Sequence, residues 1–316
     1  MANTERRDIE DIEDVRVQDV LATDPGSDVS GEASFVIIGC PVDEGVIRNG
    51  GRPGASQAPP LIRKHLSKMT PPPDMREPFI ELLRRGRDLG DVPDAGMEEM
   101  QEELASRIAP WLEKRVPVIV LGGGHETSYG HSMGYRDARQ PHHILNLDAH
   151  CDVRPLKNGA GHSGSPFRQI LEDAAGMCRS YHVLGLQPQS TARKHLEYIR
   201  SAGGDYTFAD QTDSGSVLDK IRKLTGGKDD GTAVLLTLDM DVVDQSEAPG
   251  VSAPCISGLP KSLLLETARA AGANSNVLSM DLVEVNPFFD RDDQTSRLAA
   301  LVVWHFVLGL CFRKDE

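Results

Sequence analysis

Histidine and carboxylate side chains gather in four short segments of this sequence, each directly after an apolar run. The segments are Gly122-Gly123-Gly124-His125-Glu126, Asp148-Ala149-His150-Cys151-Asp152, Asp239-Met240-Asp241 and Asp281-Leu282-Val283-Glu284. In an extended backbone, residues two positions apart point the same way. This alternation predicts that Asp148, His150 and Asp152 converge on one side of their segment, and that Asp239 and Asp241 do the same.

With His125, these residues supply four carboxylates and two imidazoles. Carboxylates packed without counter-charge repel one another and raise each other's pKa, whereas two divalent cations would offset their charge. Oxygen and imidazole ligands without thiolates suit Mn²⁺ better than structural Zn²⁺. Because two such ions lower the pKa of a shared water, the pattern predicts a hydrolase with two Mn²⁺ per chain. The predicted metal ligands are His125, Asp148, His150, Asp152, Asp239 and Asp241.

Simpler interpretations exist for each motif. A single Asp-x-Asp or Asp-x-His pair is more often a cap or a solvated turn, but three such clusters after apolar strands favour a metal site. The glycine run at 122–124 can also serve only a tight turn, and no Gly-Lys-Ser/Thr follows it as in a phosphate loop. His131, His142, His143, His182 and His195 have no cluster partners, so we expect surface or packing positions for them.

Short apolar runs alternate with amphipathic segments along the chain, which predicts a three-layer α/β/α fold with a mostly parallel sheet of about eight strands. The expected strands are 34–40, 116–121, 143–148, 180–185, 233–239 and 276–281, with weaker candidates at 87–89 and 206–208. The expected helices are 60–67, 97–111 (with Pro110 near its end), 166–173, 191–200, 214–224, 261–271 and a buried C-terminal helix at 298–312. In such sheets ligands bind beyond the carboxyl ends of the strands.

The 316 residues contain 34 Lys and Arg against 48 Asp and Glu, so the net charge is −14. This charge argues against nucleic acids and anionic membranes as partners, because both are polyanions. Residues 1–30 are expected to form a flexible acidic arm, and residues 31–316 a single catalytic domain. The five cysteines form no CxxC pair, and the start lacks an apolar signal core, which favours a reducing, cytoplasmic compartment.

The order of these motifs resembles the ureohydrolase superfamily of arginases, agmatinases and formimidoylglutamases. The resemblance covers most of residues 34–312 and rests on GGGHE at 122–126, DAHCD at 148–152, LDMDVVD at 238–244 and Glu284-Val285-Asn286-Pro287. An early loop also matches, from Gly39-Cys40-Pro41 to Asn49-Gly50-Gly51-Arg52-Pro53-Gly54-Ala55. The resemblance implies an arginase-like fold with a two-Mn²⁺ site.

Carried over by position, the resemblance groups His125, Asp148, Asp152 and Asp241 around one ion, and Asp148, His150, Asp239 and Asp241 around the other. It also implies that Asp241 takes a proton from the attacking hydroxide. His162 matches a mobile histidine that shuttles a proton to the leaving amine. Glu284 matches the carboxylate that holds the cationic amidine or guanidine group over the nucleophile. A flexible loop histidine and a solvated strand-end charge are the simpler interpretations of these two residues.

The predicted substrate is N-formimidoyl-L-glutamate, hydrolysed to L-glutamate and formamide as in histidine degradation. Arginases place acidic residues in the loop at 186–193, which here has none, and commonly have a neutral amide at the position of Arg154. A guanidinium there would pair with a substrate carboxylate. The motifs GGGHE and HSGSPFRQ also look most like formimidoylglutamases. Arg168 and Gln187 are further predicted substrate contacts, while bracing of the metal loop is the simpler interpretation of Arg154.

Two alternative functions stay open. A guanidino-substrate hydrolase of the guanidinobutyrase, arginase or agmatinase type would release urea, and guanidinobutyrate would suit Arg154 equally well. A non-catalytic arginase-like metal-binding subunit is the second alternative. Cys151 is expected to pack away from the metals, with a redox pairing to Cys40 as the other hypothesis. The resemblance also suggests a homo-oligomer, either a trimer or a hexamer.

Overall fold

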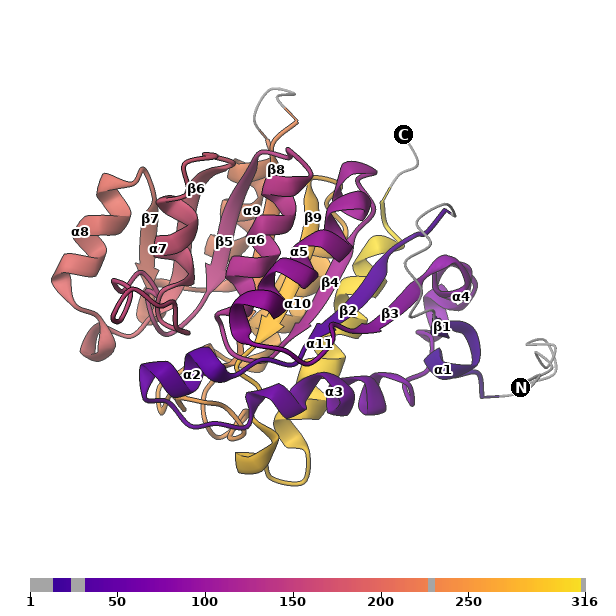
Figure 1. The fold of residues 1–316 in the computed structure, drawn as a ribbon. Coiled ribbons are helices and arrows are strands. Elements are labelled where there is room, and N and C mark those ends of the chain that lie inside the picture. The colour runs from indigo at the N-terminus through magenta and orange to yellow at the C-terminus, as the bar shows by residue number, and fades with distance from the viewer. Residues whose placement is uncertain (1–13, 24–31, 227–230, 314–316) are drawn as a thin grey trace.

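A parallel sheet forms the centre of the molecule. The computed structural model describes residues 14–23, 32–226 and 231–313, and in these residues nine strands pair in the order β1-β3-β2-β4-β9-β8-β5-β6-β7 (Figure 1). Every neighbouring pair is parallel. The strands are β1 (Ala22–Thr23), β2 (Val36–Cys40), β3 (Arg87–Asp91), β4 (Val118–Gly122), β5 (His142–Leu147), β6 (Cys178–Leu186), β7 (Asp205–Phe208), β8 (Ala233–Asp239) and β9 (Val277–Val283). The predicted parallel sheet is confirmed, and the two-residue strand β1 is its unforeseen member.

Helices cover both faces of this sheet. The helices are α1 (Val17–Val20), α2 (Glu44–Asn49), α3 (Ala58–Leu66), α4 (Arg76–Arg85), α5 (Met97–Glu113), α6 (Thr127–Asp137), α7 (Pro166–Leu171), α8 (Arg193–Ser201), α9 (Ser214–Thr225), α10 (Lys261–Gly272) and α11 (Gln294–Leu310). Figure 1 shows α5 and α6 in front of the sheet, with α10 and α11 behind it. The three-layer prediction is therefore confirmed, and so is the buried C-terminal helix.

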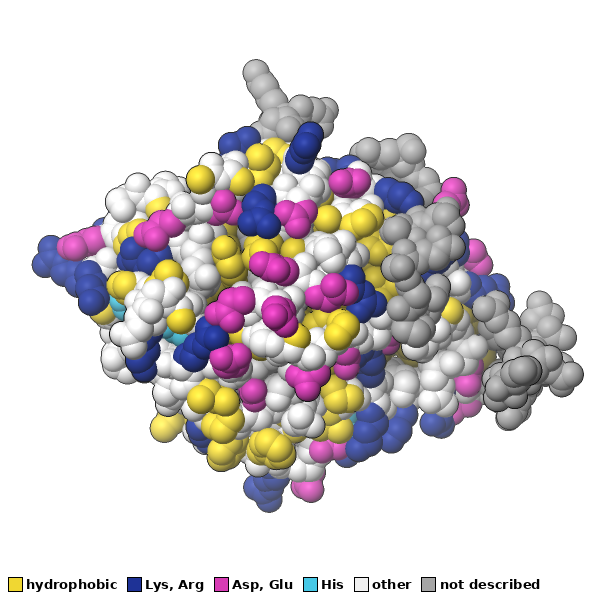
Figure 2. Space-filling model, viewed as in Figure 1, with side chains coloured by type: hydrophobic (Ala, Val, Ile, Leu, Met, Phe, Trp, Pro, Cys, Tyr) yellow, Lys and Arg dark blue, Asp and Glu magenta, His cyan; other side chains and the backbone are white. Residues whose placement is uncertain are grey.

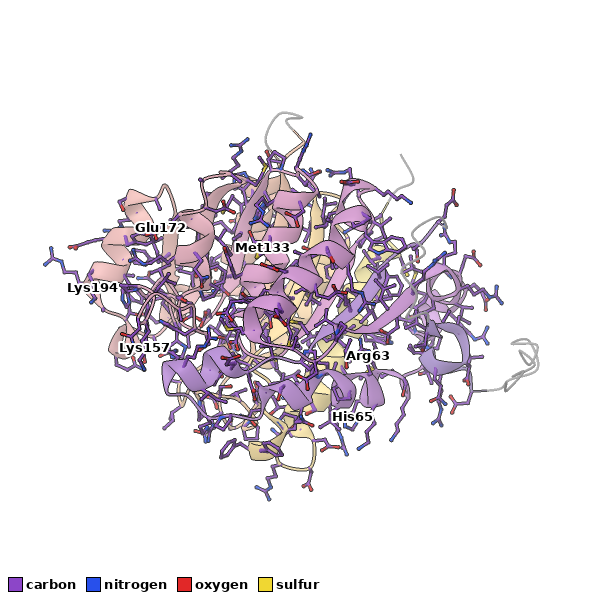
Figure 3. All side chains as sticks on the ribbon, in the orientation of Figure 1. Arg63, His65, Met133, Lys157, Glu172 and Lys194 are labelled. Carbon is purple, nitrogen blue, oxygen red and sulfur yellow. The ribbon has the colours of Figure 1, made fainter. Side chains whose placement is uncertain are left out.

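The central strands are apolar on both sides because both faces are covered. Val36 and Ile38 of β2 pack in the core cluster that includes Leu104 of α5. The residue between them, Ile37, packs on the opposite face with Ile62 of α3. On that side, Arg63 (labelled in Figure 3) fixes α3 to β3 through Nε, which donates to Asp88 Oδ2 over 2.8 Å.

The sequence patterns missed four helices, α1, α2, α4 and α6, of which α6 is the longest. Its sequence TSYGHSMGYRD has two glycines and no regular apolar stripe. The glycines permit close packing against α5, because a Cβ at Gly130 would lie 2.8 Å from Gln101 Cα and one at Gly134 would lie 2.4 Å from Ile108 Cγ1. In α5, Pro110 lies inside the helix, which continues to Glu113.

The expected acidic arm, residues 1–30, falls mostly outside the described residues. Its described part, residues 14–23, contains α1 and β1, and Val17 N donates to Met69 O over 2.9 Å. On the face drawn in Figure 2, acidic side chains gather over the middle of the molecule, where α5 lies in Figure 1. None of the described helices combines the length and apolar character needed to cross a membrane.

Candidate metal centre

The predicted metal ligands and Glu284 lie at the carboxyl ends of four neighbouring strands. Strands β4, β9, β8 and β5 are adjacent in the middle of the sheet. His125 follows β4, Asp148 follows β5, Asp239 ends β8 and Glu284 follows β9. Because parallel strands all end at the same edge, side chains from distant parts of the sequence meet there.

Three carboxylates surround one ring nitrogen of His125. Its Nδ1 lies 3.3 Å from Asp148 Oδ2, 3.0 Å from Asp152 Oδ2 and 3.1 Å from Asp239 Oδ2. Despite these distances, Nδ1 makes no hydrogen bond of acceptable geometry to any of the described residues. The four groups therefore face a common point instead of pairing with one another, as ligands around a cation do.

A second group shares one carboxylate with the first. Ligand atoms of His150, Asp239 and Asp241 lie within 4.8 Å of one another. Asp239 belongs to both groups, whereas the resemblance had placed Asp241 with His125. In the structure the last residue of β8 takes that position instead.

The local backbone differs from the predicted extended alternation. After Leu147 the strand ends, and Asp152 adopts a left-handed conformation with φ of 43°. Asp148 Oδ1 accepts a hydrogen bond from His150 N over 2.7 Å, and Asp239 Oδ1 accepts one from Asp241 N over 2.7 Å. These two short turns, not strand pleating, orient the ligands.

The charges of this cluster are strongly coupled. Burial raises the pKa values of Asp239 and Asp241 well above the usual range, and repulsion from neighbouring carboxylates raises them further. Burial opposes protonation of His125, but the carboxylates of Asp148, Asp152 and Asp239 outweigh it and raise its pKa well above the usual value. Cations bound among these carboxylates would relieve the repulsion that raises their pKa values.

The donor set fits divalent cations. It combines carboxylate oxygens with imidazole nitrogens and contains no thiolate, because Cys151 is not in either ligand group. Such a set suits Mn²⁺ and similar ions. Two divalent ions would also balance the charge of four carboxylates.

Glu284 faces the same site from the end of β9. Its backbone is left-handed, with φ of 65°, and its N donates to Gly123 O over 2.7 Å. Oε1 accepts a hydrogen bond from His125 N over 2.6 Å, while Oε2 is buried without a partner among the described residues. A strained backbone conformation of this kind persists where surrounding structure enforces it, and here it directs the carboxylate toward the ligands.

A cavity of about 170 Å³ opens onto this cluster. Its walls include His150, Asp239, Asp241 and Glu284 together with Asn49, Arg154, Ser163 and Ser252. The cavity therefore places one guanidinium across from a group of carboxylates. Arg154 thus lines the same cavity as the candidate ligands, and its pairing with a substrate carboxylate stays a prediction.

Asn49 links the two walls of the cavity and was missed from the sequence. Its Oδ1 accepts a hydrogen bond from Arg154 Nη1 over 3.1 Å, and its Nδ2 donates to Ser163 Oγ over 3.1 Å. Lys157 (labelled in Figure 3) adds a contact to α2 by donating to Arg48 O over 3.0 Å. Asn49 lies in the early loop that is part of the family resemblance, but nothing in the sequence indicated a chemical role for it.

The sequence assigned no role to Glu126. In the structure its side chain is buried against α2. Its Oε1 accepts a hydrogen bond from Gly45 N over 2.7 Å. Burial and the nearby charge of Glu284 raise its pKa to about 8. A Cβ at Gly45 would lie 2.5 Å from the Glu126 carboxyl carbon, so this contact requires glycine.

Three predicted site residues that are not metal ligands do not line this cavity: His162, Arg168 and Gln187. His162 Nε2 lies 3.1 Å from Pro155 O, and Nδ1 accepts a hydrogen bond from Gly164 N over 3.1 Å. Arg168 donates to Val153 O over 2.9 Å and stacks 3.8 Å above the Tyr198 ring. Gln187 donates to Ser257 O over 2.8 Å. The structure thus uses Arg168 and Gln187 to brace loops, and His162 is held within its own loop.

The cysteine pairing stays a hypothesis. Cys40 and Cys151 are both buried and free. Burial raises the pKa of the Cys151 thiol to about 12 and also raises that of Cys40. Burial therefore disfavours the reactive thiolate at both positions.

A sequence model of the arginase family matches residues 33–309. The protein belongs to the arginase family. A formimidoylglutamase of Geobacillus thermodenitrificans is 36% identical over 277 residues, which cover 85% of this chain and 82% of that relative. The formimidoylglutamase of Rhodococcus opacus is 37% identical over 298 residues, covering 90% and 89%.

Solved structures show the same arginase-family fold. The crystal structure of Trypanosoma cruzi formiminoglutamase with Mn²⁺ has a TM-score of 0.84 at 30% identity, and covers 96% of this chain and 100% of that chain. The resemblance to ureohydrolases and the arginase-like fold are thereby confirmed.

Proposed function

We propose that this arginase-family protein is a formimidoylglutamase that holds two Mn²⁺ and hydrolyses N-formimidoyl-L-glutamate to L-glutamate and formamide. One observation carries the proposal: candidate metal ligands, Glu284 and the Arg154 guanidinium line the same cavity. The formimidoylglutamase relatives support this choice of substrate.

Two parts of the substrate, the amidine and one carboxylate, have a complementary group. The cationic amidine would lie against Glu284, whose Oε2 has no other partner among the described residues. A substrate carboxylate would pair with Arg154, which Asn49 orients. Held at both ends, the amidine carbon is positioned for attack by water.

The ligand set divides between two ions. His125, Asp148, Asp152 and Asp239 would hold one, and His150, Asp239 and Asp241 the other. When bound, the ions would activate a water and stabilise the charge that develops on the substrate.

This chain's own side chains would handle the protons. We assign to Asp241 the proton from the attacking water, and the cavity that Asp241 and Glu284 both line supports this assignment. Water adds to the amidine carbon, the bond to the glutamate nitrogen breaks, and a proton passes to that nitrogen. We assign this last proton to His162, which would have to leave its present contacts with Pro155 and Gly164.

We further propose that the protein is a cytoplasmic homo-oligomer, either a trimer or a hexamer. The free cysteines are in keeping with a reducing compartment.

Product analysis tests the proposal. Mn²⁺-loaded protein would be incubated separately with formimidoylglutamate, guanidinobutyrate, arginine and agmatine. We expect glutamate and formamide in equal amounts from the first substrate alone. Urea from any guanidino compound, without turnover of formimidoylglutamate, would instead identify a guanidino-substrate hydrolase. Inactivity on all four with two ions bound would favour a non-catalytic subunit.

A further inference from the structure

A chain of buried polar groups runs from the back of His125 into the interface between β9 and α6. His125 Nε2 lies 3.0 Å from Thr237 Oγ1, which lies 3.4 Å from Ser128 Oγ, the longest link. Ser128 Oγ donates to Asp281 Oδ2 over 2.9 Å. His131 Nδ1 lies 2.8 Å from the same Asp281 oxygen.

All five residues are completely buried, with exposed fractions of 0%. Asp281 lies within β9 and faces α6, so it is separate from the metal ligands although it shares a motif with Glu284. His131 is not the isolated packing residue that its sequence context suggested. Burying a carboxylate costs free energy unless it is well paired, which indicates a function for the buried Asp281–His131 pair.

The carboxylate gives the chain a fixed direction. Ser128 Oγ donates to Asp281 Oδ2, and His131 Nδ1 lies where it can donate to the same carboxylate oxygen. With its proton directed to Asp281, Ser128 Oγ is left as an acceptor for Thr237. Thr237 Oγ1 is then the acceptor for a proton on His125 Nε2.

That direction selects one tautomer of His125. With the proton on Nε2, the Nδ1 lone pair points to Asp148, Asp152 and Asp239, where a cation would lie. Metal-binding histidines generally depend on such a partner behind the ring, which fixes the tautomer and raises ligand basicity.

We propose that Asp281 is a positioning residue for the metal centre: acting through Ser128 and Thr237, it holds His125 in the metal-binding tautomer, and His131 anchors the Asp281 carboxylate. The inference rests on the metal centre and is independent of which substrate the protein hydrolyses.

Asp281→Asn is the informative variant because it preserves shape while it adds donors. An Asn amide can donate to Ser128 Oγ, which frees the Ser128 proton to point at Thr237. The Thr237 proton can then point at His125 Nε2 and favour the opposite tautomer. Ser128→Ala breaks the same chain in a second place and keeps the test valid if the Asn variant does not fold.

Ser279→Ala is the matched control. Ser279 also lies on β9, two residues before Asp281, and is fully buried. Its Oγ lies 2.6 Å from Tyr135 Oη of α6, so the variant removes a buried contact across the same interface. Among the described residues, no hydrogen bond links that contact to His125.

The first readout is Mn²⁺ affinity, measured by competition with a chelator on protein whose folding is checked by metal-free thermal unfolding. Loss of a partner behind a ligating histidine typically weakens binding by about 10- to 100-fold. We expect that loss for one of the two ions in Asp281→Asn and Ser128→Ala, and less than about twofold change in Ser279→Ala. Unchanged affinity in both chain variants, or an equal loss in the control, would overturn the proposal.

The second readout is the tautomer itself, measured by nitrogen-15 NMR of histidine side chains with Zn²⁺ as a diamagnetic probe. The wild type and Ser279→Ala should show His125 protonated at Nε2 and free of a proton at Nδ1. In Asp281→Asn the Nε2 proton resonance should shift or disappear. An unchanged His125 spectrum in that variant would overturn the proposal whatever the catalytic activity.

Discussion

Arg154→Ala is the substitution that most directly tests how the substrate is recognised. Arg154 lines the cavity, and its only side-chain hydrogen bond among the described residues is the one from Nη1 to Asn49. The guanidinium therefore has donors left for a substrate carboxylate. Removing it should weaken substrate binding without changing the groups that act on the amidine.

The expected size follows from one charge-assisted contact. A hydrogen bond to a charged group contributes about 1.5–3 kcal/mol, and each 1.4 kcal/mol is about tenfold in affinity. Because Arg154 is exposed, solvent screening favours the lower part of that range. We expect KM for formimidoylglutamate to rise about 10- to 30-fold, with kcat changed less than about threefold.

The assay is steady-state formation of glutamate, with two comparisons that isolate the carboxylate. A formamidine of a simple alkylamine lacks the carboxylates, so its KM should be the same in wild type and variant. Arg168→Ala removes another guanidinium, one that binds Val153 O and stacks on Tyr198 outside the cavity, and should leave KM nearly unchanged. An equal effect of Arg154→Ala on both substrates, or no effect on either, would refute the reasoning.

Three further outcomes follow from the site. Asp239 belongs to both ligand groups and Asp152 to one. Elemental analysis should therefore show that Asp239→Asn loses both ions and that Asp152→Asn loses one. Equal losses would contradict the grouping. Asn49→Ala should raise KM for formimidoylglutamate by roughly 2- to 10-fold, less than Arg154→Ala, because one neutral hydrogen bond orients the guanidinium. Burial opposes protonation of His150, but Asp148 outweighs it and raises its pKa from 6.5 to about 9. The free energy that protonated His150 contributes to folding is complete below pH 6.5 and is lost as the pH rises to about 9. Metal-free protein should therefore unfold at a lower temperature at pH 9, and Mn²⁺ should reverse the loss. A melting temperature that does not fall would contradict this.

The sheet and the ligand residues were predictable because they depend on local patterns. Runs such as 233–238 are apolar at every position except Thr237, which is typical of a strand covered on both faces. The polar residues after them identify the strand ends, and in a parallel sheet these must meet. The structure brings the predicted ligands together even though turns, and not strand alternation, orient Asp152 and Asp241.

Features that depend on contacts between distant segments could not be predicted in this way. Helix α6 lacks an apolar stripe because glycines pack it against α5. Asn49 gains its function only when α2 meets the loop that carries Arg154 and Ser163. Arg168 is held away from the cavity by Tyr198, on a different helix. Nothing in the local sequence indicates these partners.

Anomalous diffraction from crystals grown with Mn²⁺ tests the central claim most directly. The account predicts two strong peaks per chain, one among His125, Asp148, Asp152 and Asp239, and the other among His150, Asp239 and Asp241. A single peak, or none, with His125 Nδ1 hydrogen-bonded directly to a carboxylate, would contradict the proposed metal centre and the hydrolase that depends on it.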